Sequence, residues 1–599
     1  MEAKSLWVLF TTLVFIIQGW RQTEGCLEQE RIALFQLKSF FNRPYKLERC
    51  NITNKRVIGL DLYFTRYWDN RGWRSDLSEY LNVSLFLPFE ELKSLNLSEN
   101  NIADLVDNQV SLSSVFNNLE ILDLSGNNFN DSVLSKLKSL TNLKTLDISN
   151  NMIVSLYHFE GEKVQPMMNL EVLDLSSNLL KNNDLTYLKG LSSLKSFSIR
   201  RNQLEGSISI RVLNNLTKLK QLDLSGNKIE SLQSSHDGER PINLTNLEEL
   251  YLDSNSFTNS LLAQLSGFSN LKSLNIRNNQ LKGSINIKGW CDLWKLEVLD
   301  LSENALKGTL PPCLANLSSL DYLDISDNQF TGKGASTALA NLTLLRFISL
   351  SQNLFEVPSI FISFANHSHL KFLFSDQNKL VKEPTIQTWV PKFQLKVFRL
   401  WNCATKVLHI EIPKFLYYQN DLSFIDLSDN NFGGNPFWLL ENNTRMRAFL
   451  IEGNSFMGHF NIPSHPNPNM SIVDISNNKI QGPIPANICS IFPQLARLNL
   501  SSNSLQGNIP PCLVSLNTML MIDMSHNQLY GGIPEMLAQS DSLMFLRLSN
   551  NHLSGKITPT IFCSPSLKFL YLDGNKFDGN IPSIDISTFP YYSLSDIDL

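Results

Sequence analysis

Pairs of aspartate and serine two residues apart recur along this chain and are its first candidates for acid–base chemistry. Examples are Asp123 with Ser125, Asp300 with Ser302, and Asp523 with Ser525. General acid–base catalysis needs one particular pair of groups with different pKa values, not a row of identical carboxylates. No histidine and no second class of carboxylate accompanies the row. We therefore interpret the aspartates as framework residues and expect neither an enzyme nor a cofactor.

Four of the eight cysteines lie at matching places just before adjacent predicted strands. Cys291 and Cys313 are 22 residues apart, and Cys489 and Cys512 are 23 apart. One turn of a repeating fold brings such positions close, and a disulfide needs Cα atoms about 4.4–6.8 Å apart. We predict both disulfides. The alternative is that the four side chains are small buried apolar groups. No metal site is expected.

Sequons of the form Asn-x-Ser/Thr are frequent and are typical of a secreted glycoprotein. Asn96 and Asn499 also begin sequons, but they fall on predicted strands, where asparagine is a common framework residue. The predicted glycosylation sites are Asn51, Asn82, Asn130, Asn215, Asn243, Asn316, Asn341, Asn366, Asn442 and Asn469.

A repeat positions all of these residues. Leu296 to Asn304 reads LEVLDLSEN, which is the L-x-x-L-x-L-x-x-N signature of a leucine-rich repeat. The leucines point into a core, and the asparagine amide can satisfy backbone groups in its own and the neighbouring coil. Twenty units carry this column about every 25 residues, from Asn100 to Asn575, with Cys403 replacing asparagine once.

The fold class that follows is an α/β-type repeat solenoid. We predict a right-handed, curved leucine-rich repeat superhelix, with short parallel strands on its concave side and irregular or 3₁₀ segments outside. The net charge is −5 and no long basic run is present, so nucleic acid is not expected as a partner.

The chain divides into three predicted parts. Residues 1–25 combine a charge, an apolar run of thirteen and small residues, which predicts a signal peptide; that run is too short to span a membrane comfortably. Residues 26–90 are expected to form an N-terminal cap, with a helix over 28–41 and a first strand over 57–62. Residues 91–599 hold about twenty repeats and the start of a twenty-first. No capping unit follows, so we expect a C-terminally truncated product.

Candidate binding residues are the outward side chains of those repeats that abandon the framework aspartate and serine on the concave face. Three consecutive repeats do so with aromatic residues and an arginine, which are the residue types of binding hot spots. The alternative is that these rings pack on one another or lie beneath a glycan. The predicted ligand-binding residues are Phe347, Phe372, Phe374, Arg399, Trp401, Tyr251 and Arg277.

A second motif makes a family resemblance specific. Leu505-Gln-Gly-Asn-Ile-Pro and Ile480-Gln-Gly-Pro-Ile-Pro follow the asparagine column, as in plant-type repeats. The segments CLEQERIALFQLKSFF and PPCLANLSSL resemble plant leucine-rich repeat receptor-like proteins, which are kinase-lacking cell-surface receptors. The resemblance implies a peptide, protein or wall-derived ligand, and signalling in defence or development through an adaptor receptor kinase and a co-receptor kinase. It also implies the secretory pathway and, with a C-terminal membrane helix, the plasma membrane.

Two departures from this family affect the expectations. The family's cap usually has a Cys-Cys-x-Trp segment before its final cysteine, whereas here Cys26 and Cys50 remain as the expected disulfide cysteines of the cap. The family's later repeats, acidic stretch and membrane helix are absent from this sequence. The alternative is a secreted inhibitor of microbial cell-wall hydrolases, similar to polygalacturonase-inhibiting proteins. Those inhibitors are about half this size, and the missing cap also argues against them.

Overall fold

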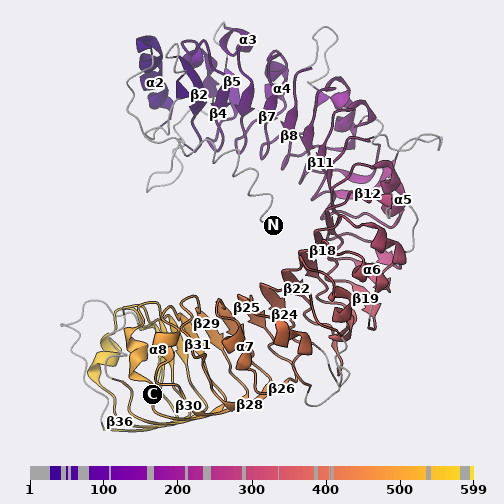
Figure 1. Ribbon diagram of the computed structural model, residues 1–599. Coiled ribbons are helices and arrows are strands. Elements are labelled where there is room, and N and C mark those ends of the chain that lie inside the picture. The colour runs from indigo at the N-terminus through magenta and orange to yellow at the C-terminus, as the bar shows by residue number, and fades with distance from the viewer. Residues whose placement is uncertain are drawn as a thin grey trace. The chain divides into compact units, whose positions relative to one another are not determined.

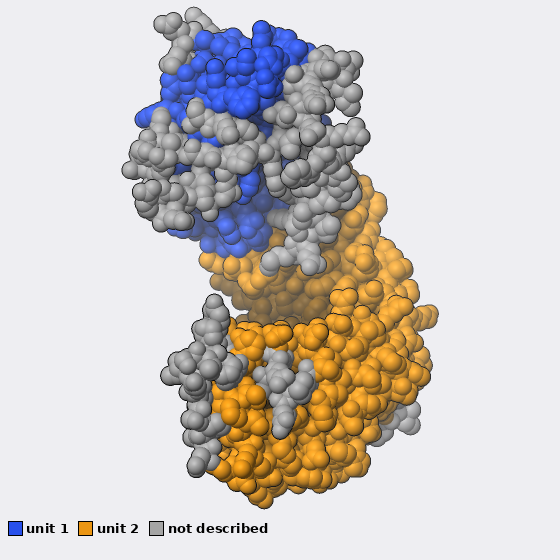
Figure 2. All heavy atoms as spheres, turned by 90° about the vertical axis from the view of Figure 1, so that its left-hand side faces the viewer, with its two compact units in different colours: residues 1–256 blue, residues 257–599 orange. Residues whose placement is uncertain are grey.

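The computed structural model describes two compact units, residues 1–256 and 257–599, and each is treated by itself (Figure 2). The predicted signal peptide and Cys26, Asn51, Asn243 and Cys291 lie outside the described residues. The described residues are 27–41, 49–50, 56–64, 80–106, 110–157, 168–209, 213–233, 244–285, 292–334, 336–382, 389–403, 405, 410–534, 541–579 and 594–599.

The first unit begins with helix α2 (Glu28–Phe40), which confirms the predicted helix. Leu37 and Phe41 are fully buried beneath it. Glu30 is also buried, and its carboxylate accepts a hydrogen bond of 3.0 Å from the N–H of Val57 in strand β2 (Val57–Asp61). Burial raises the pKa of Glu30. The helix is thereby fixed to the first strand, which is itself paired in parallel with β4 (Ser94–Asn96).

Short parallel strands run along the inner side of each unit (Figure 1). In the first unit they are β2, β4, β6 (Ile121–Asp123), β7 (Thr145–Asp147), β8 (Val172–Asp174), β9 (Ser196–Ser198), β11 (Gln221–Asp223) and β13 (Glu249–Tyr251), with β1 (Arg49–Cys50) antiparallel to β2. In the second unit they are β14 (Ser273–Asn275), β16 (Val298–Asp300), β18 (Tyr322–Asp324), β20 (Phe347–Ser349), β22 (Phe372–Phe374), β24 (Val397–Arg399), β25 (Phe424–Asp426), β27 (Ala448–Leu450), β29 (Ile472–Asp474), β31 (Arg497–Asn499), β33 (Met521–Asp523), β35 (Phe545–Arg547), β37 (Phe569–Tyr571) and β39 (Asp596–Asp598).

These strands pair in register, leucine beside leucine, as between Leu299 and Leu323. The middle residue of nearly every strand is buried and the residues beside it face outward, because side chains alternate along a strand. We call the outward side chains of these strands, with the two or three residues that follow each strand, the strand face. The predicted leucine-rich repeat solenoid with its parallel sheet is confirmed.

The asparagine column holds each coil to the one before it. The Nδ2 group of Asn328 donates to the carbonyls of Ile325 and Ser326 in its own coil and to that of Leu301 in the preceding coil, over 2.9–3.3 Å. Its Oδ1 accepts a bond of 3.0 Å from the N–H of Leu306, also in the preceding coil. Each asparagine therefore completes backbone hydrogen bonds in two coils at once.

The outer segments are short helices, as Figure 1 shows for α4 and α6. The α-helices are α3 (Leu112–Val115), α4 (Ser132–Leu137), α5 (Ser260–Gln264), α6 (Thr337–Ala340), α7 (Trp438–Asn442) and α8 (Ile488–Ile491). The 3₁₀ helices are η1 (Val83–Phe86), η3 (Asn182–Gly190), η4 (Leu213–Asn215), η5 (Leu265–Gly267), η7 (Pro312–Asn316), η8 (Ser359–Phe364), η9 (Lys414–Tyr418), η10 (Pro511–Ser515) and η12 (Pro559–Cys563). Among the described residues, no helix has the length and apolarity needed to cross a membrane.

A second set of parallel strands, which the sequence analysis did not predict, follows the asparagine column. Glycines allow this, as Gly482 does with a φ of 86° where a Cβ would collide with the His459 ring. The strands are β3 (Tyr80–Asn82), β5 (Asp104–Val106), β10 (Glu205–Ser209), β12 (Lys228–Gln233), β15 (Lys282–Gly283), β17 (Ala305–Gly308), β19 (Gln329–Gly332), β21 (Leu354–Val357), β23 (Lys379–Leu380), β26 (Gly433–Gly434), β28 (Ser455–His459), β30 (Lys479–Pro483), β32 (Ser504–Gly507), β34 (Gln528–Gly531), β36 (His552–Lys556) and β38 (Lys576–Asp578).

Candidate functional site

The aspartates of the strand face serve the backbone of their own coils. The Oδ1 atom of Asp300 accepts bonds from the N–H of Ser302 at 2.9 Å and from its hydroxyl at 2.6 Å. Burial and the neighbouring Asp324 raise the pKa of Asp300 to about 6. The repeated aspartate–serine pair thus fixes the turn after each strand. Among the described residues, no group of three or more potential ligands is placed to hold a metal ion.

Aromatic rings gather on the strand face of three consecutive coils, β18 to β22, of which only the coil of β18 keeps the aspartate–serine pair. Phe347 stacks on Tyr322 with ring centroids 4.2 Å apart and ring planes within 7° of parallel. Its centroid also lies 5.3 Å from that of Phe374 and 6.4 Å from that of Phe372. All four rings are half-buried. The predicted binding phenylalanines therefore lie together as one aromatic cluster, and they pack on each other as the alternative interpretation required.

Arg399 lies beside the aromatic cluster but has carboxylate partners of its own. Its guanidinium approaches the Oδ2 atoms of Asp376 at 3.3 Å and Asp426 at 3.6 Å, one on each neighbouring strand. Burial raises the pKa of Asp376, and Arg399 opposes that shift. The sequence analysis considered Arg399 as a partner for a ligand's acidic group and did not anticipate these pairs. In this structure Arg399 pairs with carboxylates of its own strand face.

Trp401 is held at both ends. Its backbone N–H donates to Oδ1 of Asp376 at 3.0 Å, and its indole N–H donates to Oδ2 of Asp429 at 3.0 Å. The side chain remains half-exposed on the strand face. The indole is consequently in a fixed orientation and still offers open apolar surface, which is the geometry of a preorganised contact.

Two acidic residues beyond Trp401 were not predicted. Glu452 stands where most coils have serine after the strand, and Asp474 lies on the adjacent coil. Burial, and then Asp474, raise the pKa of Glu452 to about 7. A departure from serine at this column, which also marks Trp401, was the signal that could have identified Glu452. The raised pKa lets Glu452 stay protonated beside Asp474 over more of the pH range.

The remaining predicted binding residues lie in separate units. In the first unit, the hydroxyl of Tyr251 donates to Oε2 of Glu249 at 2.8 Å. In the second unit, Arg277 forms an ion pair with Glu303, and that hydrogen bond raises the pKa of the guanidinium. Each side chain is satisfied within its own unit. Neither is brought to the aromatic cluster by any contact that the structure describes.

The residues that immediately precede the strands form a charged border, which we call the edge row. In the first unit its charges alternate from Lys93 to Lys195 and pair across coils. Glu120 binds Lys93 at 2.9 Å and Lys144 at 2.6 Å, while Glu171 binds Lys195 at 2.7 Å. These bonds lower the pKa values of both glutamates. Each charge in this part of the edge row therefore has an opposite charge beside it on a neighbouring coil.

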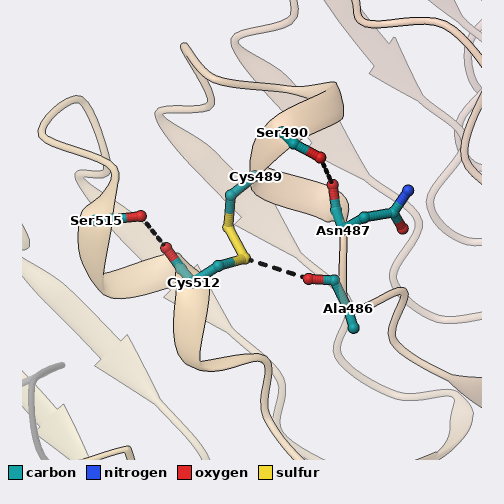
Figure 3. Close-up of a disulfide and its surroundings, with 6 residues drawn as sticks. All are labelled: Ala486, Asn487, Cys489, Ser490, Cys512 and Ser515. Carbon is teal, nitrogen blue, oxygen red and sulfur yellow. Dashed lines mark hydrogen bonds between the residues drawn. A yellow bond between two sulfur atoms is a disulfide. The ribbon is translucent and has the colours of Figure 1, made fainter.

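One predicted disulfide is present between Cys489, in α8, and Cys512, in η10 (Figure 3). Their Cα atoms are 6.0 Å apart, and Sγ of Cys512 lies 3.6 Å from the carbonyl oxygen of Ala486. Cys313 is also disulfide-bonded, while its predicted partner Cys291 lies outside the described residues. The side chain of Cys50 is likewise not described.

Cys403 is a buried free cysteine in the asparagine column. Its thiol donates to the carbonyls of Ser375 at 3.5 Å and Trp401 at 3.7 Å, which partly imitates the asparagine amide. Burial raises the pKa of the thiol to about 12. The side chain is therefore a neutral framework group, as the sequence analysis interpreted it.

Most predicted glycosylation sites that the structure describes are exposed near the ends of outer segments. Asn96 and Asn499 differ from them, since both are half-buried on the strand face. The amide of Asn499 donates to Oδ2 of Asp474 at 2.9 Å, so the nitrogen that would carry a glycan is engaged in the framework. The exposed sites are Asn130, Asn215, Asn316, Asn341, Asn366, Asn442 and Asn469, whereas Asn82 is half-buried.

Comparison with protein families matches the leucine rich repeat model over residues 168–229, with shorter matches at 118–140, 295–317, 316–337, 494–516 and 542–564. Receptor like protein 21 of Arabidopsis thaliana is 34% identical over 535 residues, covering 83% of this chain and 47% of that protein. Cuscuta receptor 1 of Solanum lycopersicum is 31% identical over 241 residues, covering 40% of this chain and 21% of that protein. The chain spans less than half the length of either relative.

Two solved receptor structures resemble this chain. The complex of PEPR1 with AtPEP1 has a TM-score of 0.59 at 25% identity and covers 93% of this chain and 83% of that one. The plant peptide hormone receptor RGFR1 in complex with RGF2 has a TM-score of 0.60 at 25% identity, with 89% and 84% covered. These similarities support the repeat fold and relate it to receptors whose complexes contain peptides.

Proposed function

Since the chain is a leucine-rich repeat protein related to the receptor-like proteins of plants, we propose that it is the extracellular ligand-recognition part of such a receptor. In this proposal the protein enters the secretory pathway and acts at the outer face of the plasma membrane. Its ligand is a peptide. Signalling in defence or development passes to an adaptor receptor kinase and a co-receptor kinase, because the family resemblance implies no kinase in the receptor itself.

The observation that carries the proposal is the break in the strand face at Phe347, Phe374 and Trp401. A purely structural coil would keep aspartate at the column of Phe374 and serine at that of Trp401, as most coils do, and the ring of Phe347 lies against that of Phe374. Half-exposed aromatic rings cost apolar surface in water unless a partner covers them. Their fixed orientation reduces the entropy that a ligand would lose on binding.

A photo-cross-linking experiment tests this proposal even while the peptide that binds is unidentified. The secreted chain carries a benzoylphenylalanine at position 374, and a control carries it at Tyr417, which is exposed in η9 on the outer side. Each protein is irradiated with a peptide fraction of plant extracellular fluid. We expect peptide adducts at position 374, few at 417, and loss of the adducts when Trp401 is replaced by serine.

Equal labelling at both positions, or labelling at 374 that the Trp401→Ser change leaves unaltered, would contradict the proposal. Hot-spot truncation weakens binding by about thirtyfold, which such labelling can resolve.

A further inference from the structure

The edge row changes character in the coils that carry the aromatic cluster. Arg346, Lys371 and Lys396 are three cations in succession, each one residue before β20, β22 and β24. Backbone hydrogen bonds place them at equivalent positions, since the N–H of Lys371 bonds to Arg346 and that of Lys396 bonds to Lys371. Like charges on neighbouring strands repel each other. From Lys93 to Lys195 in the first unit, the same row avoids this repulsion by alternating lysine with glutamate. The next two members, Lys195 and Lys220, are like-charged neighbours, but each pairs with a glutamate on its other side.

The three cations are poorly neutralised by the protein. Arg346 and Lys396 are exposed, and Lys371 is half-buried. Arg346 reaches Asp321 only at 3.9 Å, between two exposed side chains. Lys371 donates to a backbone carbonyl, that of Gln394, at 2.9 Å. Exposed pairs of this kind contribute little to stability, so the repulsion within the row is not offset.

Apolar side chains run directly beside these cations. Phe347, Phe372 and Val397 follow Arg346, Lys371 and Lys396 in the sequence and pair with one another in register across the three strands. All three are half-exposed. On the far side of this apolar strip, Arg399 pairs with Asp376 and Asp426. The positive charge that is poorly paired with carboxylates therefore lies on one border of the strip.

We propose that Arg346, Lys371 and Lys396, with the apolar strip beside them, bind an extended peptide in which acidic residues alternate with apolar ones. This inference rests on the proposed function and names its ligand class. Alternate side chains of an extended peptide point to opposite sides. Carboxylates at positions i and i+2 would face the cations, and the apolar side chains would cover the strip.

The dimensions agree with this arrangement. Three adjacent strands at about 4.8 Å spacing place the outer cations about 10 Å apart. Carboxylates two residues apart in an extended peptide are separated by about 7 Å. Long lysine and arginine side chains readily span the difference. Two acidic residues can therefore be enclosed by three cations, which neutralises the repulsion within the row.

The test uses three synthetic peptides of about ten residues and the full secreted chain, with affinity measured by calorimetry. One peptide alternates glutamate with phenylalanine, the second has the same composition in two blocks, and the third has lysine in place of glutamate. We expect the alternating acidic peptide to bind at least tenfold more tightly than either control. Lys396→Gln and Arg346→Gln should each weaken it two- to fivefold, as loss of an exposed charge pair does.

Lys371→Glu is the decisive variant, because it restores the alternation found in the first unit. We expect it to melt no earlier than the wild-type protein and to weaken the acidic peptide at least tenfold. Lys144→Glu is the matched control in the first unit, where it breaks a pair with Glu120 and places a third carboxylate between Glu120 and Glu171. That variant should melt earlier and bind the peptide normally.

Three results would overturn the inference. They are equal binding of all three peptides, undiminished binding of the acidic peptide by Lys371→Glu, and binding of the two-block peptide as tight as that of the alternating peptide. Tighter binding of an acidic sugar oligomer that is unaffected by Phe372→Ser would overturn the peptide class. Persistent cross-linking at position 374 without selectivity for the acidic peptide would reject this inference and leave the proposed receptor function standing. If neither cross-linking at position 374 nor selectivity for the acidic peptide is observed, both this inference and the proposed receptor function are rejected.

Discussion

The indole nitrogen of Trp401 donates a hydrogen bond of 3.0 Å to Asp429 of the next coil. This bond orients a large ring over the strand face without burying it. The ring therefore contributes little to the folded state beyond one partly exposed hydrogen bond, worth about 1 kcal/mol. The indole of Trp401 on the strand face therefore contributes much less to the free energy of folding than a side chain of the core does.

Replacing Trp401 with serine should shift the free energy of unfolding by about 1 kcal/mol or less. Phe398, which is fully buried on the same strand, provides the comparison. Its replacement by alanine should cost about 3–5 kcal/mol, because it leaves a cavity in the core. Urea melts of the two secreted variants measure the contrast. Similar losses for both would mean that the indole is a packing residue.

Asp147 should make the first unit less stable as the pH rises. Burial, then Asp174 and Asp123, raise its pKa from 3.8 to about 7. Between about pH 4 and pH 7 the unfolded chain has released this proton while the folded protein retains it, so stability falls as the pH increases. Asp147→Asn removes the penalty. It should stabilise the protein by about 1–2 kcal/mol at pH 8, after allowance for screening at a half-buried site.

Melting curves of wild type and Asp147→Asn at pH 4 and pH 8 check this prediction. The two proteins should converge at pH 4, where the wild-type side chain is protonated. A variant that gains as much at pH 4 as at pH 8 would contradict the assigned cause.

Removing the disulfide should destabilise the second unit locally. Cys489 and Cys512 close a loop 23 residues apart, for which loop-closure entropy gives about 3 kcal/mol. The double change to serine should lower the melting transition under non-reducing conditions. Cys403→Ser is the control that lacks any disulfide. Alkylation before denaturation should label neither Cys489 nor Cys512 in the wild-type protein.

Loss of one column asparagine should disturb two coils. Asn328→Ala leaves the carbonyl of Leu301 and the N–H of Leu306 without their side-chain partner, at about 1–3 kcal/mol for each buried group. Asn328→Cys should cost less, because a thiol can still donate, as Cys403 does. Hydrogen exchange should increase at Leu306 in the alanine variant. Exchange confined to residue 328 and its own coil would disprove the bridging role.

The sequence predicted those parts of the structure that recur in every coil. The leucine and asparagine columns, helix α2 and the Cys489–Cys512 pair all follow from spacing. The second set of strands was missed because its two to six residues carry no alternation of their own. The partners of Arg399 were missed since they lie on neighbouring coils. The charges of the edge row also pair across coils. Their pattern can therefore be interpreted only after the coils have been aligned.

The asparagine column has a consequence for how such proteins change over generations. Asn328 contacts only main-chain atoms of the preceding coil, so it places no demand on the identity of that coil's side chains. A whole coil can accordingly be gained or lost by unequal recombination, and the junction is still complete. Point substitutions at strand-face positions outside the aspartate–serine pairs are likewise free of these framework bonds. Inherited changes in what the protein recognises can thus accumulate while the fold stays the same.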